Sequence, residues 1–203
     1  MKNDCLRIAA YLPRSRANGP ALRSVLWVQG CPFRCAGCFN PDFLPFANGR
    51  SGRSGREVAT GDVADWMLTE AETEGVTFSG GEPFAQAGAL AEVAERVRAA
   101  GKGVLVFTGY DAVELRSSRN PGARRLLQAA DLLVAGRYRS DMPGRHPLLA
   151  SANQELVFLT DRYRRADFGL RRRTEFRIAA GGAITVSGFP DAAWRLGANE
   201  TIG

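Results

Sequence analysis

The chain has 203 residues, of which 45% are hydrophobic and 24% charged, and its net charge is +6. This composition is that of an ordinary folded domain, so disorder over the whole length is excluded. No stretch approaches the ~20 apolar residues of a membrane-spanning helix, and charge interrupts the first residues too early for a secretory signal. We therefore expect a single domain over residues 1–203, in a cytoplasmic protein without a membrane partner.

The positive charge comes almost entirely from arginine, since Lys2 and Lys102 are the only lysines. This bias indicates genomic base composition, and the sequence contains no helix-turn-helix signature, RNA-binding aromatic motif or zinc-finger histidine pair. Nucleic acid is therefore not expected as a partner. The arginines between Arg162 and Arg173 form either a solvated face or a docking surface for an acidic partner or nucleotide phosphates.

In chain order, the first half of the sequence alternates strand and helix signals. Residues 22–29 are rich in β-forming side chains and predict a strand that ends at Gly30. A polar loop is expected at 46–61, and a helix then begins with Asp62 as its N-cap. Residues 75–79 predict a second short strand.

The second half continues this alternation. Apolar side chains at helical spacing predict a helix around 90–97, with Gly101 just beyond its end. The remaining predicted elements are a strand at 104–107, a helix capped by Asp111, a helical piece after Pro121, strands at 131–135 and 155–159, and a β-hairpin within 174–186. Strands and helices that alternate in this way predict parallel βαβ units. The sequence contains too few such units for a closed eight-stranded barrel. The expected fold is α/β, an open partial (β/α) barrel of about five to six parallel strands with a C-terminal β-hairpin extension.

The cysteines carry the clearest chemical signal. Cys31, Cys35 and Cys38 lie within eight residues in the spacing C-x3-C-x2-C, directly after the first of these strands. Thiolates are soft ligands that select zinc, copper(I) or iron–sulfur clusters. Zinc sites and [4Fe–4S] clusters normally take four ligands, and Cys5 or His146 could supply the fourth. Without it, the three cysteines would leave one iron of a cluster open to a substrate or cofactor. Cys5 is otherwise expected as a buried strand thiol, and His146 as a surface loop residue.

A second motif, Ser79-Gly80-Gly81-Glu82-Pro83, stands at the end of the next predicted strand. With the cysteine loop, it resembles the radical S-adenosylmethionine (SAM) superfamily. Residues 18–31 and 38–41 narrow the resemblance to the glycyl-radical-enzyme activases, and above all to the anaerobic ribonucleoside-triphosphate reductase activating proteins. The likeness covers a core of about residues 5–160 and leaves about 161–203 as a C-terminal extension.

The resemblance implies a radical SAM enzyme in which Cys31, Cys35 and Cys38 hold a [4Fe–4S] cluster whose fourth iron binds SAM. An external one-electron donor such as flavodoxin or ferredoxin would drive cleavage of SAM to methionine and a 5′-deoxyadenosyl radical. That radical is expected to take hydrogen from a glycine Cα of a partner glycyl-radical enzyme. The alternative is a radical SAM enzyme that modifies a peptide or a small molecule such as a nucleotide. An iron–sulfur or zinc interaction module without enzymatic activity is the third interpretation.

The cofactor contacts implied by the same resemblance are Gly37, Phe39, Ser79, Gly80, Gly81, Glu82 and Thr108. Glu82 is expected to accept a hydrogen bond from the SAM amino group, and the two preceding glycines let the backbone approach closely. Gly37 stands where many members have an aromatic residue beside the adenine, and Phe39 is the alternative flank. No catalytic residue is expected beyond the cluster and the SAM site.

Overall fold

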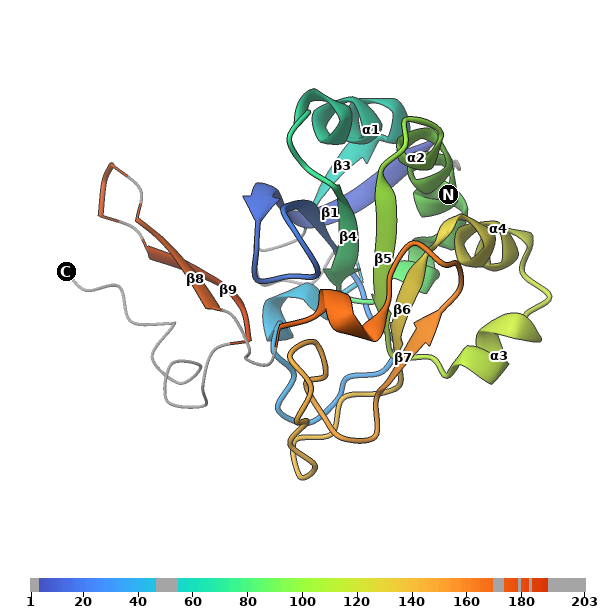
Figure 1. Cartoon of the computed structure of the whole chain (residues 1–203), viewed down its shortest axis with the longest axis vertical. Coiled ribbons are helices and arrows are strands. Elements are labelled where there is room, and N and C mark those ends of the chain that lie inside the picture. Colours follow the sequence, from blue (N-terminus) through green and yellow to red (C-terminus); the bar gives the residue numbers. More distant parts are fainter. Residues whose placement is uncertain (1–3, 47–54, 170–173, 179, 183, 190–203) are drawn as a thin grey trace.

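The computed structural model describes residues 4–46, 55–169, 174–178, 180–182 and 184–189. Its centre is a seven-stranded sheet in the order β3-β1-β2-β4-β5-β6-β7, and β8 and β9 form a separate two-stranded sheet (Figure 1). The strands are β1 Cys5–Ser15, β2 Arg23–Val28, β3 Arg56–Ala59, β4 Gly75–Gly80, β5 Gly103–Thr108, β6 Leu132–Ala135, β7 Glu155–Phe158, β8 Thr174–Ile178 and β9 Ile184–Gly188. The α-helices are α1 Thr60–Thr69, α2 Ala87–Ala99, α3 Ala112–Arg116 and α4 Pro121–Ala129.

Four strands form the parallel part of the large sheet, since β2, β4, β5 and β6 pair in parallel. The other three strands pair antiparallel: β1 with β2 and with the edge strand β3, and the edge strand β7 with β6. The predicted α/β class and C-terminal hairpin are confirmed, but four of the described strands run parallel, where about five to six were expected. The strand predicted at 155–159 forms as β7 and runs antiparallel. For two neighbouring strands to run parallel, the connection must carry the chain back along the sheet to the end where the first strand began, and a helix usually does this. The segment between β6 and β7 contains no helix.

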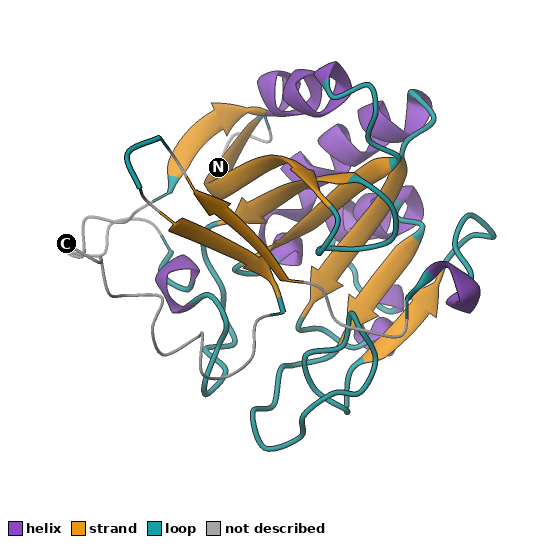
Figure 2. Cartoon of the chain, turned by 60° about the vertical axis from the view of Figure 1, so that its left-hand side comes forward, coloured by secondary structure: helices purple, strands orange, loops and turns teal. Residues whose placement is uncertain are grey.

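Alternate side chains of the parallel strands face two different cores. Val104 and Val106 of β5 belong to the larger core, which includes buried side chains of α1, α2 and α4. Leu105 belongs to a second cluster on the opposite face, together with Leu132 and Tyr163. Figure 2 shows the helices gathered on one side of the sheet. Irregular segments that follow β6 and β7 pack on this second face, through Leu148 and Phe168.

The first helix begins earlier than predicted. Residues 56–59, expected as part of a polar loop, form β3 and pair with β1, and the chain enters α1 directly from that strand. Ala59 is therefore the N-cap, and Asp62 lies in the first turn. Residues 47–54, most of the remainder of that predicted loop, lie outside the described residues. By contrast α2 is as predicted, with Gly101 at φ +82° beyond its end.

The C-terminal hairpin presents its polar side to the main body. Glu175 accepts hydrogen bonds from Ser15 Oγ and Arg16 N, both at 2.6 Å. On the other side of the two-stranded sheet, the cross-strand pair Ile178 and Ile184 is 73% and 54% exposed. Polar contacts thus hold the hairpin to the loop that precedes β2.

Candidate functional site

The predicted site residues lie at the carboxyl ends of three neighbouring strands of the large sheet. Because β2, β4 and β5 are parallel, their carboxyl ends meet at one edge of the sheet. The cysteine loop follows β2, residues 79–82 lie at the end of β4, and Thr108 ends β5. The backbone N–H of Glu82 donates to the carbonyl of Gly30 at 2.8 Å. The tertiary structure therefore brings the first two motifs into direct contact.

The cysteine loop is closed at its base. Gly30 N donates to Phe43 O at 2.8 Å, and Cys31 N donates to Leu44 O at 2.9 Å. The side chain of Gln29, 3% exposed, donates to two further carbonyls on the returning part of the loop. The residues between these contacts therefore project as one unit from the end of β2.

The three cysteines of this loop are free thiols; Cys31 is buried, and Cys35 and Cys38 are half-buried. Cys38 Sγ accepts a hydrogen bond from Asn40 N at 3.4 Å, and Cys31 accepts from two backbone N–H groups of its own loop. Burial raises the pKa of Cys31 and of Cys38, and these donors oppose the rise. Hydrogen bonds of this kind favour the thiolate, which is the form that binds metals.

Among the described residues, no three His, Cys, Asp or Glu side chains converge on one ion-sized position. That part of the chain therefore offers no four-ligand zinc site completed by Cys5 or His146. A [4Fe–4S] cluster does not require the three sulfurs to meet at one position, because each cysteine binds a different iron. Three soft thiols on one closed loop, with N–H groups directed at the sulfurs, are a donor set that fits such a cluster.

Close packing between β2 and β4 explains the two glycines of the second motif. Gly80 has φ +108°, and a Cβ there would lie 2.4 Å from Val28 N. A Cβ on Gly81 would lie 2.3 Å from Gly30 O. A side chain at Gly80 would push β2 away from β4, and one at Gly81 would push away the base of the cysteine loop. Ser79, one position earlier, is half-buried at the end of the same strand.

The carboxylate of Glu82 is buried and has three donors within the protein. Oε1 accepts from Phe84 N at 2.8 Å and from Thr108 Oγ1 at 2.9 Å, and Oε2 accepts from Gly109 N at 2.8 Å. Burial raises the pKa of Glu82 to about 7, against the opposing effect of these hydrogen bonds. The side chain thus ties the end of β4 to the end of β5. Its contact with a SAM amino group stays a prediction.

Gly37 and Phe39 flank the third cysteine and contact the loop that follows β6. Gly37 has φ +69°, and a Cβ there would lie 3.3 Å from Ser140 Cβ. The Phe39 ring lies edge-on to Tyr138 at 5.0 Å and 6.2 Å from the ring of Phe189. This side of the cysteine loop is therefore covered by later parts of the chain, and the predicted adenine contacts of both residues stay predictions.

Three residues at this edge make contacts that the sequence analysis did not single out: Phe33, Gly109 and Arg137. The Phe33 ring lies against Gly109 and makes a T-shaped contact with Tyr110 at 4.7 Å. The guanidinium of Arg137 lies 4.5 Å from the centre of the same ring. An aromatic residue between cysteines and a glycine after a strand are each common, so no sequence signal connected them.

The other singled-out residues have mainly structural surroundings. Cys5 begins β1 as predicted but is half-buried and not buried. His146 lies in a loop, and burial lowers its pKa. Arg162 forms an ion pair with Glu74 at 2.8 Å, which makes it part of the fold. Residues 171–173 of the arginine run lie outside the described residues.

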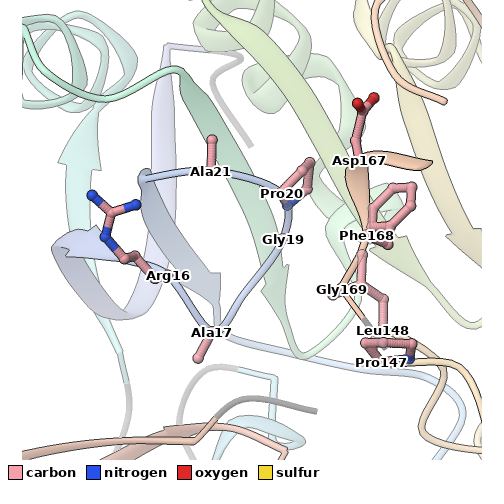
Figure 3. Close-up of a pocket in the computed structure, with 10 residues that line it drawn as sticks. All are labelled: Arg16, Ala17, Gly19, Pro20, Ala21, Pro147, Leu148, Asp167, Phe168 and Gly169. Carbon is pink, nitrogen blue, oxygen red and sulfur yellow. The ribbon is translucent and has the colours of Figure 1, made fainter. Parts of the chain in front are cut away.

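A small pocket of about 50 Å³ lies on the face of the sheet opposite the helices (Figure 3). Residues 16–17 and 19–21 bound it on one side, and residues 147–148 and 167–169 on the other. None of the predicted cofactor contacts lines it. It is therefore separate from the site at the carboxyl edge.

Residues 17–157 match the family model described as "4Fe-4S single cluster domain". The match includes the cysteine loop and the segment 79–82. The chain belongs to this family.

Curated relatives have more specific names. An anaerobic ribonucleoside-triphosphate reductase-activating protein of Vibrio cholerae is 32% identical over 132 residues, which are 63% of this chain and 81% of that protein. The protein of the same name from Escherichia coli K12 is 29% identical over 136 residues, 65% of this chain and 84% of the relative. A pyruvate formate-lyase-activating enzyme of Listeria monocytogenes is 33% identical over 132 residues, 63% of this chain and 51% of that enzyme.

The names of these relatives confirm the predicted resemblance to the glycyl-radical-enzyme activases. They also confirm that the chain is an enzyme of the radical SAM activase type. The family match supports the predicted iron–sulfur cluster. Within the described parts of the chain, no helix has both the length and the apolar character needed to cross a bilayer.

Proposed function

We propose that this chain activates a glycyl-radical enzyme by generating a radical on a glycine Cα of that partner. Cys31, Cys35 and Cys38 would hold three irons of a [4Fe–4S] cluster and leave the fourth for the amino and carboxylate groups of SAM. When bound, the reduced cluster supplies the electron that cleaves SAM to methionine and a 5′-deoxyadenosyl radical, which takes the glycine hydrogen. The electron would come from an external donor such as flavodoxin or ferredoxin.

The direct connection between the cysteine loop and the Gly80–Glu82 segment supports this proposal most strongly. Glu82 N donates to Gly30 O and Gly81 N donates to Val28 O, both at 2.8 Å. A cofactor held by both motifs would be oriented by this rigid connection, and orientation supplies a large part of the rate in such a site. Gly37, Phe39, Ser79 and Thr108 would complete the SAM contacts.

The proposal is tested with anaerobically reconstituted protein, SAM, a strong one-electron reductant and a candidate glycyl-radical enzyme from the same source. We expect release of 5′-deoxyadenosine and a glycyl doublet in the EPR spectrum of the partner. Cleavage of SAM without that doublet for any candidate partner would contradict the activase function. Absence of SAM cleavage by protein that carries the cluster would contradict the radical SAM chemistry itself.

A radical SAM enzyme acting on a peptide or small molecule is the second candidate. The family match ends at residue 157, whereas the structured hairpin β8–β9 lies beyond it. Residues 167–169, also beyond the match, line the pocket in Figure 3. Such additions would suit a substrate that the shorter relatives do not take. Mass spectrometry of candidate substrates after turnover, searching for a covalent change that depends on SAM, distinguishes this function.

A further inference from the structure

Phe33 occupies the space in which a side chain at position 109 would stand. A Cβ on Gly109 would lie 2.5 Å from Cδ2 and 2.6 Å from Cε2 of the Phe33 ring. Gly109 is not among the described glycines with positive φ, so its backbone conformation does not by itself demand glycine. The ring of Phe33 therefore accounts for the glycine at this position.

Two further side chains hold the Phe33 ring. Tyr110 packs against it with ring centres 4.7 Å apart and an interplanar angle of 72°. The guanidinium of Arg137, which follows β6, lies 4.5 Å from the ring centre in a cation–π contact. The ring thus joins the cysteine loop to the ends of both β5 and β6. Aromatic and cation–π contacts of this geometry are both attractive, so they favour one position of the ring.

The same glycine also connects to the second motif. Gly109 N donates to Glu82 Oε2 at 2.8 Å, and the preceding Thr108 hydroxyl donates to Glu82 Oε1 at 2.9 Å. A continuous set of contacts therefore runs from Phe33 through Gly109 to Glu82. It connects the cysteine loop to the 80–82 segment by a second route, separate from the backbone bond between Glu82 and Gly30.

We propose that Phe33 is a positioning residue, which, through Gly109, sets the place of the cysteine loop relative to residues 80–82. The inference rests on the proposed function, because it concerns the SAM that would bridge these two motifs. A displacement of about 1 Å between groups that orient a reacting molecule can cost on the order of a hundredfold in rate. Phe33 need not touch SAM to have this effect.

A double-mutant cycle tests the proposal, using Phe33→Ala, Gly109→Ala and the double variant. SAM cleavage is measured per reconstituted cluster, so that loss of iron does not count as loss of activity. We expect each single variant to lower kcat at least about tenfold at saturating SAM, and to alter the change that SAM causes in the EPR spectrum of the reduced cluster. Because Gly109→Ala acts through the ring, the double variant is expected to be no worse than Phe33→Ala alone.

Two controls accompany the cycle. Phe33→Tyr keeps the ring and is expected to retain most of the activity. Val113→Ala alters a side chain that is 76% exposed on α3 and is expected to change nothing. Additive losses in the cycle, or single variants with the wild-type rate and spectrum per cluster, would overturn the proposal.

A measurement without cofactor separates this inference from the proposed function. In cluster-free protein, the destabilisation caused by Gly109→Ala is expected to be smaller when Phe33 is already alanine, and additive stabilities would refute the contact. Wild-type protein that carries the cluster but fails to cleave SAM would refute the proposed function and with it the positioning role. Wild-type protein that cleaves SAM without forming a glycyl radical would refute only the activase assignment.

Discussion

Arg23 Nη1 lies 2.8 Å from the hydroxyl of Tyr163, which is 140 residues later in the chain. The side chain of Arg23 is fully buried at the start of β2, and it also donates to Glu74 Oε2 at 2.7 Å and to Thr77 Oγ1 at 2.9 Å. Burial raises the pKa of Tyr163 to about 12, so its hydroxyl keeps the proton that it donates to Glu74. This network holds the segment after β7 against the edge of the sheet opposite the cysteine loop.

Replacing Arg23 tests how much this network stabilises the fold. We expect Arg23→Ala to lower the free energy of unfolding by about 3–5 kcal/mol, because several buried acceptors, among them Thr77 Oγ1 and the carbonyl of Val76, lose their donor. Glu74 keeps Arg162 as its ion-pair partner. Denaturant titration measures the change. Arg125→Ala removes an exposed pair with Glu95 and is expected to cost less than about 1 kcal/mol. Equal losses for the two variants would contradict the importance of the buried network.

The cysteine assignment is tested by comparing all four cysteines. Alanine at Cys31, Cys35 or Cys38 is expected to abolish binding of the iron–sulfur cluster and cleavage of SAM, because each residue would hold a separate iron. Cys5→Ala is the matched control and is expected to retain about four irons per chain after reconstitution. Iron and sulfide analysis with visible absorption measures the cluster. Loss of iron in Cys5→Ala would show that a fourth cysteine is involved.

Glu82 is expected to make stability depend on pH. Its pKa is raised from 4.5 to about 7 in the folded protein, so the fold favours the protonated carboxyl. The stabilisation is therefore complete below pH 4.5 and is lost as the pH rises through 7. Relative to a Glu82→Gln variant, which does not titrate, cluster-free wild-type protein is expected to lose about 3 kcal/mol between pH 4 and pH 8.

This pH effect is measured by denaturant titration of both proteins at several pH values. The variant also carries a constant penalty. In either orientation of the glutamine amide, its NH2 group faces a backbone N–H, that of Gly109 or that of Phe84, and two donors then oppose each other. That penalty does not vary with pH. Stability curves that run parallel from pH 4 to pH 8 would contradict the raised pKa.

The attachment of the C-terminal hairpin depends on Glu175. We expect Glu175→Ala to increase amide hydrogen exchange in β8 and β9 by about tenfold, because the bonds to Ser15 and Arg16 contribute about 1–2 kcal/mol to holding the hairpin. Exchange in β4 and β5 is expected to stay unchanged. Glu155→Ala, an exposed position on β7, serves as the control. Unchanged exchange in the hairpin would show that its other contacts, among them the bond from Asn18 Nδ2 to Ser187 Oγ, retain it without Glu175.

Features that depend on neighbouring residues were predictable from the sequence. Apolar runs that end at glycine marked β2 and β4, and helical spacing with Gly101 marked α2, because local sterics and periodicity determine these elements. The direction of β7 and the existence of β3 were not predictable in this way. Both depend on pairing with distant strands, and such pairing overrides local propensity.

The sequence by itself determined the chemistry of this protein: three cysteines at a spacing that suits an iron–sulfur cluster, followed by the Gly80-Gly81-Glu82 motif after the next strand. Only the tertiary structure decided how these motifs are joined. The hydrogen bond from Gly109 N to Glu82 joins residues 27 positions apart, and the packing of Phe33 on that glycine joins residues 76 positions apart. Contacts at that separation form only when parallel strands bring their carboxyl ends to one edge, and no local sequence pattern encodes which side chains then meet.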